Sequence, residues 1–329
     1  MGGADPRPLV PVIVGATGVG KTAVAAALAA RLPITVISAD ARQVYRGLDI
    51  GTAKPDPALR ARVPHLGLDL VEPGERYSAG RFARDAAGWI GDAFAAGRQP
   101  VVVGGTGFYV RAVADGLFRE PPLDARARSR VAAWADAIDP AELARWAGRL
   151  DRAFSGGGRQ RAARAVEVAL LTGRPLSWWQ QEARATGVMR PWYIHLTLPR
   201  DELLRRIADR TRAMLARGLV AEVRALRARG TADDAPGLDG VGYRETVAML
   251  AGALPEAELE AAIVRATRRY AKRQETWFRH QLRRETGSES RETMVWSLNA
   301  TGSPEAVATE IHERWARVSA PVSTSSRGR

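Results

Sequence analysis

The sequence predicts an α/β fold, in which helices cover a parallel β-sheet and a helical segment is inserted into this core. Three observations support this prediction. Short apolar runs alternate with helix-like runs over residues 9–117, which is typical of a parallel sheet with helices on both faces. A glycine-rich loop of the phosphate-binding type occupies residues 15–22. Strand signals then disappear over residues 118–188 and return at residue 192.

The first predicted elements flank the glycine-rich loop. Residues 10–14 form an apolar run short enough for a buried strand, and residues 23–30 are an Ala-rich stretch with high helix propensity. A strand, a glycine-rich turn and a helix in this order let backbone N–H groups surround an anion. The ammonium group of Lys21 adds positive charge, and the hydroxyl group of Thr22 is a ligand for Mg²⁺. We therefore expect a P-loop NTPase-like phosphate site formed by Gly15, Thr17, Gly18, Val19, Gly20, Lys21 and Thr22.

Two further strands are predicted in the same part of the chain. Residues 34–38 are rich in β-branched side chains and lead to Asp40, whereas residues 100–103 are a buried run that leads to Thr106. Ligands of open parallel sheets bind at the carboxyl ends of the strands. We therefore expect the phosphate loop, Asp40 and Thr106 to lie together at that edge.

Helix signals fill much of the remaining chain. Ser78 is a suitable N-cap for a helix that Gly97 ends, and another helix begins near Arg159 and ends at Gly173. A strand predicted at residues 192–198 is followed by a further helix.

These signals divide the chain into four parts. Residues 9–117 and 189–318 form the α/β core, and the second of these segments contains a basic C-terminal helix. Residues 118–188 form the helical insertion, and residues 319–329, rich in Ser and Arg, form a disordered tail.

The composition narrows the possible functions. The chain has no cysteine and only four scattered histidines, which argues against disulfides and against a Cys- or His-based metal site. No apolar run approaches membrane-spanning length and residues 1–8 lack a signal-peptide pattern, so we expect a cytoplasmic protein without a membrane partner. The net charge is +13, which suggests a polyanionic partner if the charge is clustered and an Arg-rich composition alone if it is not.

The positive charge is clustered within residues 265–284. At about 100° per residue, one helix face carries Arg265, Arg269, Lys272, Arg279 and Arg283. The opposite face carries Ile263, Ala266, Tyr270 and Trp277. A row of cations with few acids fits a nucleic-acid backbone better than it fits a merely solvated helix face.

The phosphate loop alone leaves the chemistry open. Phosphoryl-transfer proteins with such a loop usually hold Mg²⁺ with an acid at the end of a second buried strand, but residues 101–103 lead into Gly-Gly-Thr. Asp40 follows the other strand, where it could be the metal ligand of a kinase or a base acting on an acceptor beside the phosphates. It could also be a helix or turn cap.

Seven segments of the sequence follow, in order, the motifs of a known family. They are GATGVGKT (15–22), ISADARQVYRGLDIGTAKP (37–55), YSAGRF (77–82), VVVGGTGFYVRAVADGL (101–117), RQRAARAVEV (159–168), VGYRE (241–245) and YAKRQETWFR (270–279). GLDIGTAKP and AKRQETW are the specific ones. Over residues 9–315 the chain resembles the tRNA dimethylallyltransferases, also called tRNA isopentenyltransferases.

The resemblance implies a prenyl transfer. Enzymes of this family move a dimethylallyl group from dimethylallyl diphosphate to N6 of the adenosine just 3′ of certain tRNA anticodons. The phosphate loop then holds the diphosphate, with Mg²⁺ as cofactor, and ATP is neither needed nor consumed. Asp40 matches the family's general base, and Thr106 matches its residue that hydrogen-bonds near the acceptor amine. We expect Arg210 to join the diphosphate site and the protein to act as a monomer.

We also expect a set of tRNA contacts from these segments. They are Asp40, Ala41, Arg42, Gln43, Thr106, Arg128, Gln160, Arg161, Arg164, Arg244, Arg269, Lys272, Arg273, Gln274 and Arg279. Arg164 has a simpler alternative role, an ion pair with Glu167 three residues along a helix.

The sequence departs from the family pattern in two places. Ala41 and Arg42 stand where the family has a small polar residue followed by an apolar one, and Gly157 and Gly158 stand where it has Asn-Asp. The second departure affects how the insertion is anchored and how it meets the anticodon stem, and it leaves the chemistry untouched.

Three other interpretations remain possible. An adenylate isopentenyltransferase would prenylate free AMP or ATP, but the insertion and the basic helix argue against it. A small-molecule kinase with a P-loop is disfavoured because the strand leads into Gly-Gly-Thr. A non-catalytic nucleic-acid-binding protein would have no need of Asp40 and Thr106 at the edge that carries the phosphate loop.

Overall fold

The computed structural model describes residues 5–118, 123–183, 185–285 and 294–320, with only the backbone described at residues 283–285. The described residues form two compact units. The first combines those of Met1–Ala114 and Val188–Arg329, and the second consists of those of Asp115–Gly187. Among the described residues, no helix is both long and apolar enough to cross a membrane.

The first unit is built on a six-stranded sheet in which every neighbouring pair of strands is parallel. The strand order is β3-β2-β4-β1-β5-β6. The strands are β1 (Leu9–Val14), β2 (Ile34–Ser38), β3 (His65–Leu66), β4 (Gln99–Gly104), β5 (Arg190–Thr197) and β6 (Val295–Asn299). The predicted α/β fold is confirmed, and the four predicted strands are the four central ones. The edge strands β3 and β6 were not predicted.

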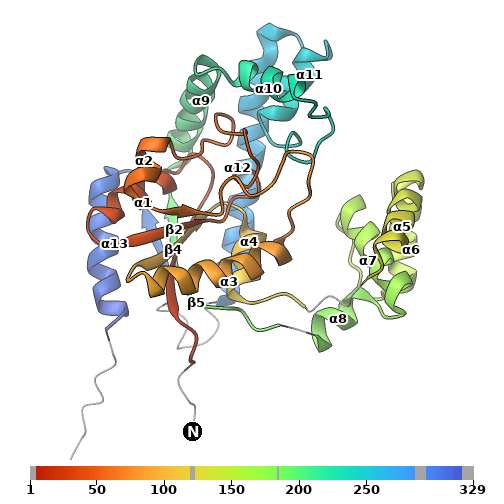
Figure 1. Ribbon diagram of the computed structural model, residues 1–329, viewed down its shortest axis with the longest axis horizontal. Coiled ribbons are helices and arrows are strands. Elements are labelled where there is room, and N and C mark those ends of the chain that lie inside the picture. The colour runs from red at the N-terminus through yellow and green to blue at the C-terminus, as the bar shows by residue number, and fades with distance from the viewer. Residues whose placement is uncertain (1–4, 119–122, 184, 286–293, 321–329) are drawn as a thin grey trace, which may run out of the picture. The chain divides into compact units, whose positions relative to one another are not determined.

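Helices cover both faces of this sheet (Figure 1). Helices α1 (Lys21–Ala29) and α13 (Pro304–Val318) pack against each other and share a buried apolar cluster with side chains of the sheet. Helices α3 (Ala79–Ala95) and α4 (Gly107–Ala114) also pack together, and both contact β4. The predicted N-cap of α3 is confirmed, because the hydroxyl oxygen of Ser78 accepts a hydrogen bond from the backbone N–H of Arg81 at 3.1 Å.

The basic segment belongs to a long helix, α12 (Leu259–Glu285), which contacts α4, α9 (Arg200–Ala216) and α11 (Tyr243–Leu250). The sequence predicts a basic C-terminal helix here, but β6 and α13 follow it in the chain. The remaining helices of this unit are α2 (Pro57–Arg62), α10 (Leu219–Ala228) and the short 3₁₀ helix η1 (Glu256–Glu258).

The named elements of the second unit are all helices in its described part. They are α5 (Ala125–Ala137), α6 (Pro140–Leu150), α7 (Arg159–Thr172) and α8 (Leu176–Glu182). The predicted helix from Arg159 is α7, and it ends at Gly173, which adopts the left-handed conformation (φ 69°) that favours glycine. The predicted tail falls largely on residues 321–329, which lie outside the described residues.

Candidate active site

The loops that follow β2, β4 and β1 lie side by side at one edge of the sheet, because these three strands are consecutive neighbours. Asp40 follows β2, Thr106 follows β4, and the phosphate loop follows β1. The hydroxyl oxygen of Thr106 accepts a hydrogen bond from the backbone N–H of Ala41 at 3.0 Å. One carboxylate oxygen of Asp40 accepts from the backbone N–H of Arg42 at 2.8 Å. The expected grouping of Asp40, Thr106 and the phosphate loop is therefore present.

The phosphate loop has the backbone conformation that its glycines permit. Gly18 and Gly20 have φ values of 88° and 101°, in the left-handed region that strains other residues. Gly20 is the N-cap of α1 and offers no side-chain cap, so the first N–H groups of this helix face the loop without a capping side chain. The amino group of Lys21 donates to the carbonyl oxygens of Gly15 at 3.0 Å and Ala16 at 2.9 Å.

Two cations and one carboxylate interact beside this loop. Burial lowers the pKa of Lys21 to about 8, against the opposing effect of the Asp40 carboxylate and with a further lowering by Arg210. Burial also lowers the pKa of Arg210, which projects from α9, and Asp40 again opposes this effect. The expected placement of Arg210 near the phosphate loop is thus consistent with the electrostatics. Together Lys21 and Arg210 give this edge the positive charge that a diphosphate requires.

A metal ion at this loop would have few ligands from the protein. Thr22 lies in the first turn of α1 with an exposed side chain. Within the described ranges, no group of three or more His, Cys, Asp or Glu side chains is arranged to hold a metal ion. Mg²⁺ usually keeps several waters and is bound by one or two protein oxygens together with substrate phosphates. A threonine hydroxyl beside a phosphate loop fits this kind of site.

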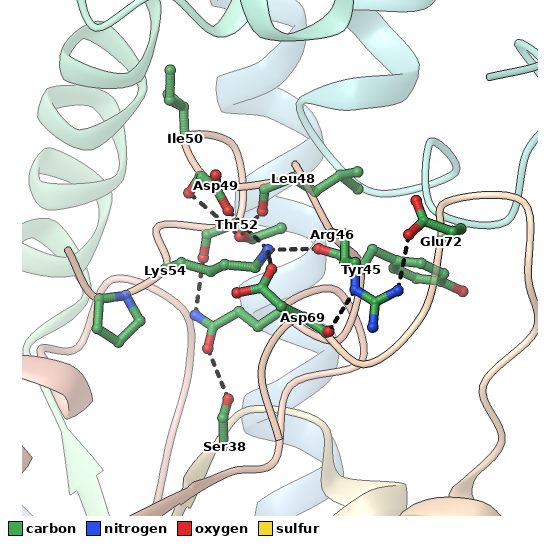
Figure 2. Close-up of polar contacts among 12 residues, drawn as sticks. Ser38, Tyr45, Arg46, Leu48, Asp49, Ile50, Thr52, Lys54, Asp69 and Glu72 are labelled. Carbon is green, nitrogen blue, oxygen red and sulfur yellow. Dashed lines mark hydrogen bonds and ion pairs between the residues drawn. The ribbon is translucent and has the colours of Figure 1, made fainter. Parts of the chain in front are cut away.

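The loop after Asp40 is fixed from inside by Lys54, whose side chain is fully buried. The amino group of Lys54 donates to the carbonyl oxygen of Tyr45 at 2.5 Å and to carboxylate oxygens of Asp49 at 2.9 Å and Asp69 at 2.6 Å (Figure 2). Burial acts to raise the pKa of Asp69, but Lys54 and Arg60 together hold it below its usual value. The GLDIGTAKP segment, residues 47–55, is therefore a structural element of the loop that carries Asp40.

Gln43 belongs to the same hydrogen-bond network. Its side-chain oxygen accepts from the hydroxyl of Ser38 at 2.7 Å, and its amide nitrogen donates to the carbonyl oxygen of Thr52 at 3.2 Å. The side chain is 9 % exposed. Of the residues expected to contact tRNA in this loop, Gln43 is thus occupied by bonds within the protein, whereas Ala41 and Arg42 are half-buried.

Two helices contact the GLDIGTAKP segment: α10, through Glu222, and α11, which begins within the VGYRE segment. The carboxylate of Glu222 accepts hydrogen bonds from the backbone N–H groups of Asp49 at 3.0 Å and Ile50 at 2.8 Å, and from the hydroxyl of Tyr243 at 2.6 Å. Gly51 has no room for a side chain, because a Cβ atom there would lie 2.5 Å from the ring of Tyr243. The two sequence segments are therefore packed against each other.

Arg42 explains one of the two departures from the family pattern. Its guanidinium group donates to the carbonyl oxygen of Pro236 at 2.6 Å and lies 3.6 Å from the carboxylate of Asp239. Asp239 is also 3.7 Å from Arg244, whose side chain is exposed. Arg42 thus connects the loop after Asp40 to the segment that precedes α11.

The basic face predicted on α12 is confirmed where the structure describes side chains. Arg265, Arg269, Lys272 and Arg279 are exposed, Ile263 and Ala266 are buried, and Tyr270 and Trp277 are half-buried. The side chain of Arg283 lies outside the described residues. Arg273 is exposed as well, whereas Gln274 is buried.

A cavity of about 620 Å³ opens on this basic face. Its lining residues come from α4 and α12 and include four cationic side chains and no acid. They are Arg111, Arg269, Lys272, Arg273, Thr276, Trp277, His280 and Gln281. Arg111, Trp277 and His280 were not predicted as site residues, although Arg111 lies in the family-like segment 101–117. The cavity offers a cationic rim and an aromatic wall to an anionic ligand.

Tyr270 is another residue of this site. The sequence pattern places it only on the packed face of the helix. Burial and the Asp40 carboxylate raise its pKa to about 12, against smaller opposing effects of Arg42, Thr106 and Arg273. Tyr270 therefore lies within reach of the same group of residues as Asp40 and Thr106.

The remaining expected tRNA contacts lie in the second unit, on α5 and α7. Arg128 and Arg164 both form ion pairs with Glu167, the first at 2.8 Å. Gln160 and Arg161 are exposed in the first turn of α7.

The N-terminus of α7 shows the second departure from the family pattern. It follows Gly158, which caps the helix without a side-chain hydrogen bond. Replacing an Asp or Asn cap by Gly costs only a few tenths of a kcal/mol, so this departure is mild for helix stability.

Comparisons with known proteins agree with this geometry. A family model described as IPP transferase matches residues 43–281, and one described as isopentenyl transferase matches residues 8–61. The chain is 46 % identical to a tRNA dimethylallyltransferase from Halorhodospira halophila over 284 residues, which cover 82 % of this chain and 89 % of the relative. It is 42 % identical to tRNA dimethylallyltransferase 2 from Geotalea uraniireducens over 275 residues, which cover 81 % and 88 %.

A solved structure also resembles the chain along almost its whole length. The full-length tRNA isopentenylpyrophosphate transferase from Bacillus halodurans has a TM-score of 0.66 and 33 % sequence identity, covering 94 % of this chain and 96 % of that one. The family model spans well over half of this chain, and both relatives exceed 40 % identity. The chain therefore belongs to the IPP transferase family, whose members include the tRNA dimethylallyltransferases.

Proposed function

We propose that this chain transfers a dimethylallyl group from dimethylallyl diphosphate to N6 of the adenosine 3′ of the anticodon in tRNA, with release of diphosphate. One observation carries the proposal. Asp40, Thr106 and the phosphate loop follow three neighbouring parallel strands, so a carboxylate and a diphosphate site face the same space.

The carboxylate of Asp40 supplies the basicity that the acceptor lacks. The lone pair of the adenine N6 amine is delocalised into the ring, which makes this nitrogen a weak nucleophile. As the new C–N bond forms at C1 of the dimethylallyl group, the bond from C1 to the diphosphate oxygen breaks. The N6 proton passes to the Asp40 carboxylate. Such general-base assistance typically contributes 10²–10⁴-fold to a rate. The hydrogen bond from Arg42 N–H to one carboxylate oxygen keeps this side chain oriented.

The phosphate loop stabilises the leaving group. Negative charge builds up on the diphosphate as the C1–O bond breaks. The first N–H groups of α1, which no side chain caps, and the cations Lys21 and Arg210 would stabilise this charge beside the loop. A Mg²⁺ ion held by the Thr22 hydroxyl and the diphosphate would neutralise further charge at this position. No phosphoryl group moves, so the reaction does not consume ATP.

The basic face of α12 is the proposed binding surface for the tRNA backbone in this unit. Arg269, Lys272, Arg273 and Arg279 are exposed, and no ion pair neutralises them within the part of the chain that the structure describes. Phosphate groups are bound by such clusters of cations. All these residues come from one chain, so the proposal needs only a monomer, and we expect it to act in the cytoplasm.

The proposal is tested by incubating the protein with radiolabelled dimethylallyl diphosphate and either bulk tRNA or AMP. We expect the label to enter tRNA and not AMP, to require Mg²⁺, and to appear without ATP. Labelling of AMP would indicate an adenylate isopentenyltransferase. If tRNA stimulates the release of phosphate from ATP, the protein would instead be a phosphate-transferring enzyme. Binding of tRNA without any labelling would indicate a non-catalytic protein.

A further inference from the structure

The side chain of Gln274 joins two loops of the active site. Its oxygen accepts a hydrogen bond from the backbone N–H of Thr17 in the phosphate loop at 2.8 Å. Its amide nitrogen donates to the carbonyl oxygen of Gly105 at 2.8 Å. The residue is 7 % exposed and lies on the buried face of α12. One amide thus connects the end of β1 to the end of β4.

Two glycines of the segment after β4 make room for α12. A Cβ atom on Gly105 would lie 2.2 Å from the amide nitrogen of Gln274, and a Cβ atom on Gly107 would lie 2.2 Å from the ring of Trp277. Neither glycine has a positive φ, so these positions need glycine for space and not for backbone conformation. The segments VVVGGTGFY and AKRQETW therefore fit into each other at this point.

Only an amide of this length can make both bonds. A carboxylate in its place would offer two acceptors, and an ammonium group only donors, whereas Gln offers one oxygen and one N–H group at the required separation. A relative displacement of the two loops would break one of these bonds and leave a buried polar group unsatisfied, which is unfavourable.

We infer that Gln274 is a positioning residue, which holds the phosphate loop and the Thr106 segment in fixed register so that the diphosphate and the acceptor amine stay aligned. This inference rests on the proposed function. It assigns Gln274 a positioning role in place of the tRNA contact expected from the sequence. The cations of α12, among them Arg269 and Lys272, lie on the opposite, exposed face of the helix.

A Gln274→Met variant tests the inference, because methionine has a similar length and makes neither hydrogen bond. Calorimetry with inorganic diphosphate and Mg²⁺, in the absence of tRNA, reports on the phosphate loop alone. We expect the dissociation constant to rise about tenfold, as for the loss of a hydrogen bond. With tRNA and dimethylallyl diphosphate as substrates, kcat should also fall, while the affinity for tRNA stays within about twofold of the wild-type value.

Thr267→Val is the matched control. Thr267 lies on the same helix, half-buried, and its hydroxyl donates to the carbonyl oxygen of Ile263 at 2.8 Å, a bond that stays within the helix. We expect this variant to retain wild-type diphosphate affinity, kcat and tRNA affinity. If Gln274→Met keeps the diphosphate affinity but binds tRNA weakly, Gln274 is a tRNA contact and the inference is overturned.

A double-mutant cycle tests the contact even if Gln274→Met unfolds. Gly105→Ala should lower kcat/KM at least tenfold in the wild-type protein, because its methyl group meets the Gln274 amide. In a Gln274→Ala background, Gly105→Ala should lower kcat/KM less than about threefold. Equal effects in the two backgrounds would overturn the inference. If the wild-type protein binds diphosphate but labels no tRNA, the proposed function fails, and the diphosphate affinities still decide the role of Gln274.

Discussion

The backbone N–H of Ala41 donates a hydrogen bond to the hydroxyl oxygen of Thr106 at 3.0 Å. The backbone N–H of Thr106 in turn donates to the carbonyl oxygen of Ala39 at 3.1 Å. The residues on both sides of Asp40 are therefore bonded to Thr106. This places the proposed general base in a fixed position relative to the end of the neighbouring strand.

The Thr106 hydroxyl is expected to matter for the rate. Thr106→Val removes the acceptor of the Ala41 N–H group, and an unsatisfied buried group costs about 1–3 kcal/mol, so kcat should fall about 10- to 100-fold. Thr106→Ser keeps the hydroxyl and should stay within about threefold of wild type. Steady-state kinetics with saturating tRNA measures both variants. Equal activity of the two variants would show that the hydroxyl group has no role.

Binding of the diphosphate substrate should depend on the protonation of Lys21. Its pKa is lowered to about 8, so the amino group is charged in the free protein below that pH and neutral above it. A bound diphosphate favours the charged form, so binding above pH 8 requires proton uptake. The dissociation constant of dimethylallyl diphosphate, measured without tRNA, should be flat below pH 8 and rise above it. Lys21→Ala should bind more weakly at every pH and lack this rise.

The basic face of α12 should determine the salt dependence of tRNA binding. Changing Arg269, Lys272 and Arg279 to Ala together should weaken binding regardless of tRNA sequence. The slope of log K against log salt concentration should become shallower by up to about one unit for each phosphate group that the variant no longer binds. Filter binding at several salt concentrations measures this slope. An unchanged slope would mean that this face is only solvated.

The buried Lys54 should be important for stability. Lys54→Met leaves the carboxylates of Asp49 and Asp69 without their shared cation, and removing one partner of a buried ion pair typically costs about 3–5 kcal/mol. We expect about 3 kcal/mol, because both carboxylates are partly exposed. Urea unfolding measures the change. Arg46→Ala, which breaks the exposed pair with Glu72, should cost less than about 1 kcal/mol, and an equal cost for both variants would contradict this account.

The central strands could be predicted from the sequence because they are buried on both faces and read as continuous apolar runs. The edge strands could not. Strand β3 has only two residues, His65 and Leu66, and β6 has a mostly exposed or half-buried pattern. Two residues are too few for a strand signal, and the short apolar run of β6 is interrupted by Ser297.

The site shows a similar division. The common location of Asp40 and Thr106 could be predicted, because it follows from the parallel direction of β2 and β4. The burial of Gln43 and Gln274 was missed, since an amide side chain gives no apolar signal. For Gln274 the helical period did contain the information, because this residue falls on the same side of α12 as Ile263 and Ala266. The partners of Lys54 come from separate parts of the chain and could not be paired from sequence.

The most direct test of the account is the single-turnover rate of prenyl transfer by Asp40→Asn with tRNA and dimethylallyl diphosphate. Asparagine keeps the shape of Asp40 and its bond to the Arg42 N–H group but cannot take up the N6 proton. The account predicts that the rate falls about 10²- to 10⁴-fold while the affinity for tRNA stays within a few-fold. Partial rescue by excess Mg²⁺ would instead make Asp40 a metal ligand. A rate close to that of the wild-type protein would make Asp40 a structural cap and contradict the proposed mechanism.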